Sequence, residues 1–169
     1  TKPFKKIVEI YQLGITSIGE NRVNDAIKKF ESSKNIPTVE RRFIGHLQSN
    51  KTKKCVNFFD TIDSIHSLKL LKKVSKECEK IEKKIEVLLE INTSGETQKK
   101  GFLVENTKEI LQCFEVRNVQ VVGLMTMAPF TKDEKKIRSC FSLLRNMKNN
   151  LNKSLTSRPL KELSMGMSN

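Results

Sequence analysis

The segment "DTIDSIHSLKLLKKVSKECEKIEKKIEVLLEIN" (residues 60–92) contains one complete strand–helix–strand unit. Its two ends, "DTIDSI" (60–65) and "KIEVLLEIN" (84–92), are short and largely apolar, as is typical of buried strands. Between them, apolar residues recur every three or four positions, and Ser67 is placed to cap the start of a helix. This apolar stripe consists of Leu68, Leu71, Val74, Cys78, Ile81 and Ile85. The unit therefore predicts two buried strands joined by an amphipathic helix with a basic outer face.

The same alternation extends through the whole chain. Further strands are predicted at 15–21, 41–47, 119–127 and 160–167, and further helices at 22–32, 49–59, 104–116 and 133–152. Apolar strands that alternate with amphipathic helices indicate a parallel sheet with right-handed crossovers. Such a sheet is either open and doubly wound or most of a (βα)8 barrel. No strand is followed by G-x-G-x-x-G or a P-loop, and polar residues recur at nearly every strand's carboxyl end, so we expect the barrel.

Composition indicates one soluble domain. The 169 residues are 37% hydrophobic and 30% charged, and no apolar run approaches the ~20 residues that span a bilayer. The start "TKPFKK" has no apolar segment behind it, so no signal peptide is visible. The cysteines lack C-x-x-C spacing and a nearby histidine pattern, which argues against zinc and for reduced, packed thiols: Cys55, Cys78, Cys113 and Cys140. We expect a cytoplasmic protein without a membrane role.

The net charge of +13 favours polyanions through long-range attraction. Most lysines, however, alternate with glutamates on helical faces, and the chain has no Trp and one Tyr to stack on bases. We interpret the charge as a solvated lysine-rich surface, without a specific nucleic-acid site.

Polar residues at the strand ends are the candidates for a functional site, because these ends converge on one mouth in a barrel. Each also has an alternative role as a helix cap, above all Ser49, Ser67 and Thr93. His46 directly follows the apolar "FIG" and needs a polar partner. The full set comprises Glu20, Asn21, His46, Gln48, Ser49, Asn50, Ser64, His66, residues 92–96, Thr126 and residues 164–168.

The segment "LKELSMGMSN" (160–169) is the most distinctive of these ends. Leu160, Leu163 and Met165 are the apolar residues of a predicted buried strand. That strand delivers Ser164, Gly166 and Ser168, whose small side chains and free N–H groups suit an anionic ligand.

Several ordered segments together resemble the pyridoxal phosphate homeostasis proteins, single-domain relatives of the alanine racemase barrel domain. They are "TKP" at the start, "GENRV" (19–23), "FIGHLQSNK" (43–51), "INTSGE" (91–96), "KKGF" (99–102), "GLMTMAP" (123–129) and "LSMGMS" (163–168). The resemblance covers essentially the whole chain. It implies a (βα)8 TIM-type barrel, like the N-terminal domain of alanine racemase, with pyridoxal 5′-phosphate in its mouth.

The resemblance also implies roles for individual residues. The cofactor is held in this family as a Schiff base on the lysine immediately before "TKP", hence before Thr1. Asn21 would lie beside the cofactor ring or its lysine, His46 and Asn92 would line the mouth, Met165 and Met167 would pack near the ring, and Ser164, Gly166 and Ser168 would address the phosphate. Glu20 and Arg22 flank Asn21 as a candidate ion pair.

Family members continue beyond "SMGMS" into a further phosphate-binding segment. We therefore expect residues 1–169 to be a single pyridoxal-phosphate-binding barrel domain that lacks its first and last strands. Arg42 and Lys100 depart from the family pattern and alter the charge at the rim.

The expected function is a cofactor carrier in intracellular homeostasis rather than an enzyme. A pyridoxal phosphate enzyme needs a positioned acid–base group. The second domain that supplies one in racemases has no counterpart here, and Tyr11, the single tyrosine, falls in the first helical segment. A pyridoxal-phosphate-dependent racemase or lyase is the alternative, and a nucleic-acid-binding module comes third. Apoenzymes that receive the cofactor are the expected partners, and the protein is expected to be a monomer.

Overall fold

The computed structural model describes residues 2–31, 38–155 and 157–167, and its centre is one parallel sheet. Six strands lie side by side in chain order: β1 (Ser17–Glu20), β2 (Glu40–Phe43), β3 (Thr61–Ile65), β4 (Ile85–Asn92), β6 (Val119–Ala128) and β7 (Glu162–Met167). This consecutive order confirms the prediction and excludes the strand-order reversal of a doubly wound sheet. The short β5 (Phe102–Leu103), which pairs with the end of β4, was not predicted.

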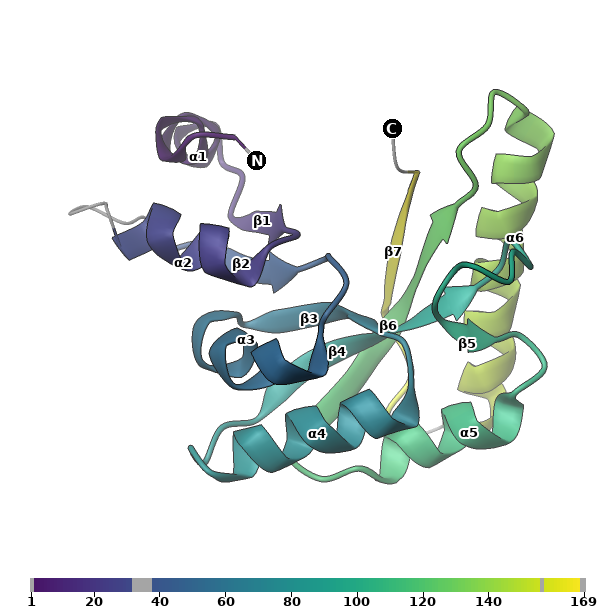
Figure 1. The fold of residues 1–169 in the computed structure, drawn as a ribbon. Coiled ribbons are helices and arrows are strands. Elements are labelled where there is room, and N and C mark those ends of the chain that lie inside the picture. The colour runs from purple at the N-terminus through teal and green to yellow at the C-terminus, as the bar shows by residue number, and fades with distance from the viewer. Residues whose placement is uncertain (1, 32–37, 156, 168–169) are drawn as a thin grey trace.

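The sheet curves into an open half-barrel, with its helices on the outside (Figure 1). These helices are α1 (Phe4–Gln12), α2 (Val23–Glu31), α3 (Thr52–Phe58), α4 (Leu68–Glu79), α5 (Thr107–Gln112) and α6 (Glu134–Ser154). The main core lies between helices and sheet, where Leu71 and Val74 of α4 pack with Val87 and Leu89 of β4. Alternate residues of a strand point to opposite faces, so the other face of each strand is left for the concave interior.

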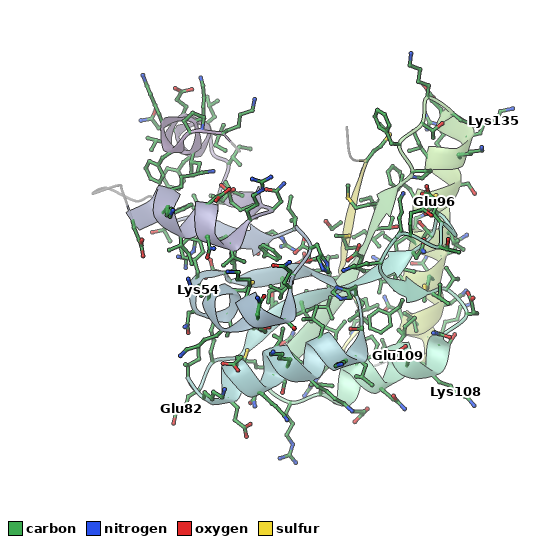
Figure 2. All side chains as sticks on the ribbon, in the orientation of Figure 1. Lys54, Glu82, Glu96, Lys108, Glu109 and Lys135 are labelled. Atoms are coloured by element: carbon green, nitrogen blue, oxygen red, sulfur yellow. The ribbon has the colours of Figure 1, made fainter. Side chains whose placement is uncertain are left out.

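Helix α4 is shorter than its apolar stripe predicted. It ends at Glu79, Ile81 is 44% exposed, and Ile85 is the first residue of β4. Glu82 adopts a positive φ of 50°, and the Lys83 N–H returns to the Cys78 carbonyl, which is a common way to close a helix. Figure 2 shows Glu82 at this turn between α4 and β4. The apolar period continued across the turn because the next strand begins with its own buried residues.

A smaller core joins the first elements of the chain. Ile7 of α1, Ile18 of β1 and Phe30 of α2 pack together, and the rings of Phe4 and Phe30 meet edge to face at 5.5 Å. This cluster attaches α1 to the first strand of the half-barrel.

Strand β7 lies at an edge of the sheet, where it pairs with β6 on one side. Leu160 is buried but precedes the strand, whereas Met165 is 44% exposed. The prediction of a fully buried strand was therefore wrong, since no neighbour covers this edge within the described residues. Among the helices that the structure describes, none combines the length and apolar character needed to cross a membrane.

Candidate functional site

An inner cavity of about 310 Å³ opens at the carboxyl ends of the central strands. Its wall combines apolar and polar side chains from several strand ends, as the predicted barrel mouth requires. The wall consists of Ile44, Gly45, His46, Ser64, Glu90, Lys100, Met125 and Met127.

Glu90 is the least expected member of this wall. It lies on β4 in register with Met125 of β6, so both side chains face the concave interior. Burial raises the pKa of the Glu90 carboxyl to about 7, and Lys100 partly opposes this rise. Sequence reasoning missed Glu90, although an acidic residue inside the apolar run "VLLEIN" was a visible signal.

His46 has the polar partner that its position required. Its Nε2 atom lies 2.7 Å from the ammonium group of Lys100, and its ring centroid lies 4.9 Å from that of His66. Burial, assisted by Lys100, lowers the pKa of His46, and burial together with His46 lowers the pKa of His66. Both imidazoles are therefore neutral at pH 7, which lets His46 accept the hydrogen bond from Lys100.

Asn21 lies beside the inner cavity rather than in its wall. It follows β1 and lines two neighbouring cavities, one of them shared with His46 and the other with Lys2 and Ile44. Its carbonyl oxygen would lie only 2.1 Å from a Cβ atom placed on Gly45. The two segments that follow β1 and β2 thus pack so closely that only glycine fits at position 45.

The predicted ion pair between Glu20 and Arg22 does not form. Glu20, which is 6% exposed, instead accepts a hydrogen bond from Lys29 of α2, whereas Arg22 lies 3.7 Å from Asp25. Strand β1 ends at Glu20, and Arg22 lies in the connection to α2, so Glu20 is buried while Arg22 stays at the surface.

Asn92 organises a loop and does not line the inner cavity. Its Nδ2 group donates to the Glu96 carbonyl, and its Oδ1 atom accepts from the Gly95 N–H and the Ser94 hydroxyl. These hydrogen bonds occupy the amide of Asn92. Asn92 therefore affects the site indirectly, by holding the shape of the loop that leads to Lys100.

The end of β7 separates its small residues from its methionines. A Cβ atom on Gly166 would lie 3.6 Å from Sδ of Met127, so Gly166 faces the inner cavity. Ser164 is on the same face and hydrogen bonds with Asp63, while the alternation of the strand turns Met165 and Met167 to the opposite, exposed face. The two methionines thus lie outside the wall of the inner cavity, and their expected packing near the cofactor ring stays a prediction. Ser168 and Thr1 lie outside the described residues.

The open edge of β7 also presents backbone groups. Because Pro129 has no N–H, the pairing of Met167 with Ala128 runs through the backbone of Ala128. Ser164 and Gly166 therefore bond to β6, and Met165 and Met167 direct their N–H groups to the open edge. This edge offers hydrogen-bond donors at the place where the sequence predicted an anion cradle.

A charged network forms the floor beneath the inner cavity. Arg42 of β2 lies within ion-pair distance of three carboxylates, at 2.9 Å from Glu40, 3.1 Å from Asp63 and 2.6 Å from Glu162. Burial disfavours the charge of Arg42, but Asp63 and Glu162 outweigh burial and raise its pKa. Burial raises the pKa of Asp63, and Arg42 and Ser164 oppose that rise.

The wall of the inner cavity suits a small aromatic ligand with polar substituents. Ile44, Met125 and Met127 supply apolar surface, while His46 and Glu90 supply hydrogen-bonding groups. Within the described ranges, no three His, Cys, Asp or Glu side chains come close enough together to hold a metal ion.

The sequence matches the alanine racemase N-terminal domain family over residues 5–169. It is also 37% identical over 169 residues to the pyridoxal phosphate homeostasis protein of Aquifex aeolicus, covering 99% of this chain and 73% of that protein. The chain belongs to the pyridoxal phosphate homeostasis protein family. The resemblance read from the ordered motifs is therefore confirmed.

Solved structures agree with this family assignment. PipY of Synechococcus elongatus, determined without PLP, has a TM-score of 0.91 at 30% identity, covering 99% of this chain and 79% of that one. PipY with PLP bound has a TM-score of 0.87 at 29% identity, covering 99% and 78%. An alanine racemase of Clostridium difficile shares the fold, with a TM-score of 0.69 at 17% identity over 88% of this chain and 38% of that one.

Proposed function

We propose that this member of the pyridoxal phosphate homeostasis family binds pyridoxal 5′-phosphate in the inner cavity and holds it for delivery to apoenzymes. The observation that carries the proposal is the position of this cavity, at the carboxyl ends of the strands of a half-barrel that matches PLP-bound PipY. The cofactor would supply an aldehyde and a phosphate group, and the chain would supply the surfaces that orient them.

The residues of the wall fit such a ligand. Ile44 and Met125 would contact the pyridine ring, and Glu90 or His46 would hydrogen bond to its polar substituents. Gly166 leaves space where a side chain would stand, and the N–H groups of Met165 and Met167 lie on the open edge of β7. Because the Ser164 hydroxyl bonds with Asp63, the phosphate would be addressed by these backbone N–H groups.

A racemase or lyase remains the alternative, and one observation favours it. Glu90, His46 and Lys100 place groups able to transfer protons in the wall of the inner cavity. Against this, Tyr11 lies on α1, away from that wall. We favour the carrier because holding the cofactor does not require a positioned acid–base group.

The first experiment uses protein expressed from its complete gene and records the visible spectrum before and after borohydride treatment. Reduction fixes the cofactor to the amine that holds it, and peptide mapping then locates the label. We expect the label on the peptide leading into "TKPFK", from the lysine that the resemblance places directly before Thr1. A label on Lys99 or Lys51, or no label, would contradict this placement.

A matched pair of variants on β7 tests the cavity itself. Gly166→Val inserts a side chain beside Met127 and should abolish cofactor absorbance, whereas Met167→Val changes the exposed face and should retain it. Equal binding by both variants would show that the cofactor lies elsewhere.

The carrier and the enzyme are separated by turnover. Incubation of the loaded protein with L-amino acids in D₂O should give α-proton exchange near the uncatalysed rate. Exchange at ~1 s⁻¹, a rate ordinary for an enzyme, would favour the alternative.

A further inference from the structure

A second cavity, the outer groove, lies next to the inner cavity on the rim of the half-barrel. It measures about 450 Å³, and its polar wall includes His46, His66, Ser67, Lys69, Lys73 and Lys100. This volume lies in the range of small-molecule sites. His46 and Lys100 also belong to the inner cavity, so the two sites share a wall.

The charge of the outer groove differs from that of its neighbour. Its wall contains the ammonium groups of Lys69, Lys73 and Lys100 and no carboxylate, whereas the wall of the inner cavity contains Glu90. None of these three lysines forms an ion pair within the described part of the chain. Three lysines in a wall that holds no carboxylate favour an anion there, although Glu90 lies within electrostatic reach of Lys100 and Glu77 within reach of Lys73.

The lysines come from two separate parts of the fold. Lys69 and Lys73 are one turn apart on α4, so both project from the same side of the helix. Lys100 approaches from the loop after β4, where its hydrogen bond to His46 holds it at 2.7 Å. This arrangement surrounds the groove from two sides, as recognition of a compact anion requires.

The backbone at the start of α4 contributes little. Its Leu70 N–H is bonded to the Ser67 hydroxyl, and its Leu68 N–H is bonded to Glu109 of α5. Figure 2 shows Glu109 where α4 and α5 meet. The attraction for an anion therefore rests on the lysine side chains.

We propose that the outer groove is a second anion site, which binds the phosphate group of small phosphate monoesters beside the cofactor cavity. The ligand class rests on the proposed function, because a phosphorylated form of the cofactor would pass this groove as it enters or leaves. The evidence for an anion site, in contrast, comes only from the lysines that line the groove. A compact dianion matches three ammonium groups around one concavity better than an extended acidic peptide would.

The test uses full-length protein whose inner cavity has been blocked by borohydride reduction of the bound cofactor. Inorganic phosphate and pyridoxamine 5′-phosphate, which has no aldehyde, are titrated and followed by ³¹P NMR. Both should bind, whereas pyridoxine without phosphate should not. Failure of both phosphates to bind at 10 mM would overturn the proposal.

A charge-matched pair of variants locates the site. Lys69→Gln/Lys73→Gln should weaken phosphate binding about tenfold or more, which corresponds to the loss of at least one charge-assisted contact. Lys72→Gln/Lys76→Gln removes the same charge from exposed positions of α4 outside the groove and should change binding less than twofold. An equal loss in both pairs would mean non-specific attraction and would overturn the proposal.

The two proposals fail in different ways. Absence of a pyridoxyl label after reduction would contradict cofactor binding in the inner cavity. Phosphate binding that depends on Lys69 and Lys73 would still support the outer groove in that case.

Discussion

Arg42 on β2 and Glu162 on β7 form an ion pair of 2.6 Å although three strands lie between β2 and β7 in the sheet. In a flat sheet, four strand spacings would place them ~19 Å apart. The contact therefore requires the strong curvature of a barrel, and it joins both sides of the concave face.

Replacement of Arg42 should destabilise the fold strongly. Arg42→Met leaves Asp63, whose side chain is 3% exposed, buried without its cation. We expect the free energy of unfolding to fall by about 3 kcal/mol, measured by urea denaturation.

The neighbouring Arg41 provides the control. It pairs with Asp60 at 3.2 Å, but both side chains are about a third exposed or more, so Arg41→Met should cost only ~1 kcal/mol. Similar losses for both variants would mean that the interior network does not stabilise the curvature.

Glu90 should make stability depend on pH. Its pKa is raised from 4.5 to about 7, so the folded state binds a proton that the unfolded state has released between these values. This contribution to stability is complete below pH 4.5 and is lost as pH rises through 7. Glu90→Gln should therefore be more stable than the parent at pH 8, by ~3 kcal/mol at most, with the difference vanishing near pH 4.

The control for this effect is Glu86→Gln, which removes an exposed carboxylate from the same strand. Thermal unfolding of the three proteins between pH 4 and 8 provides the comparison. A constant difference between Glu90→Gln and the parent across this range would refute the assignment.

Gly45 should not tolerate even one methyl group. Its Cβ atom would lie 2.1 Å from the Asn21 carbonyl oxygen, so the two segments would have to separate. Gly45→Ala should cost at least ~3 kcal/mol. Gly166→Ala makes ordinary contact at 3.6 Å and should stay within ~0.5 kcal/mol of the parent, as chemical denaturation would measure.

The cysteines should be unreactive in the folded protein. All four are free and buried. Burial raises the pKa of Cys78 to about 11 and that of Cys113 to about 12, which leaves almost no thiolate at pH 7. Ellman's reagent should react with them only as fast as the protein unfolds. Rapid labelling of any one thiol in the native state would contradict this burial.

The strand order was predictable because each strand is a separate apolar run and each connection contains its own amphipathic helix. The ends of the elements were less predictable. The apolar stripe of α4 was extended to Ile81 and Ile85 because the spacing of apolar residues gives no sign of a turn. Only the left-handed backbone of Glu82 marks that turn, and glutamate gives no signal for it.

The candidate site was predictable to a smaller extent. Strand ends located His46 and Gly166, because the carboxyl ends of parallel strands converge. The positions of strand ends do not predict which side chains from distant segments contact each other. Lys100 reaches His46 across 54 positions of sequence, and the amide of Asn92 folds back onto its own loop.

The floor of the half-barrel carries more negative than positive charge, since Arg42 faces Glu40, Asp63 and Glu162. With all four groups ionised, an anion that moved deeper into the interior would meet net repulsion, whereas the rim carries Lys69, Lys73 and Lys100. The interior thus carries an electrostatic gradient along the barrel axis, which would favour an anionic group at the rim over one at the floor.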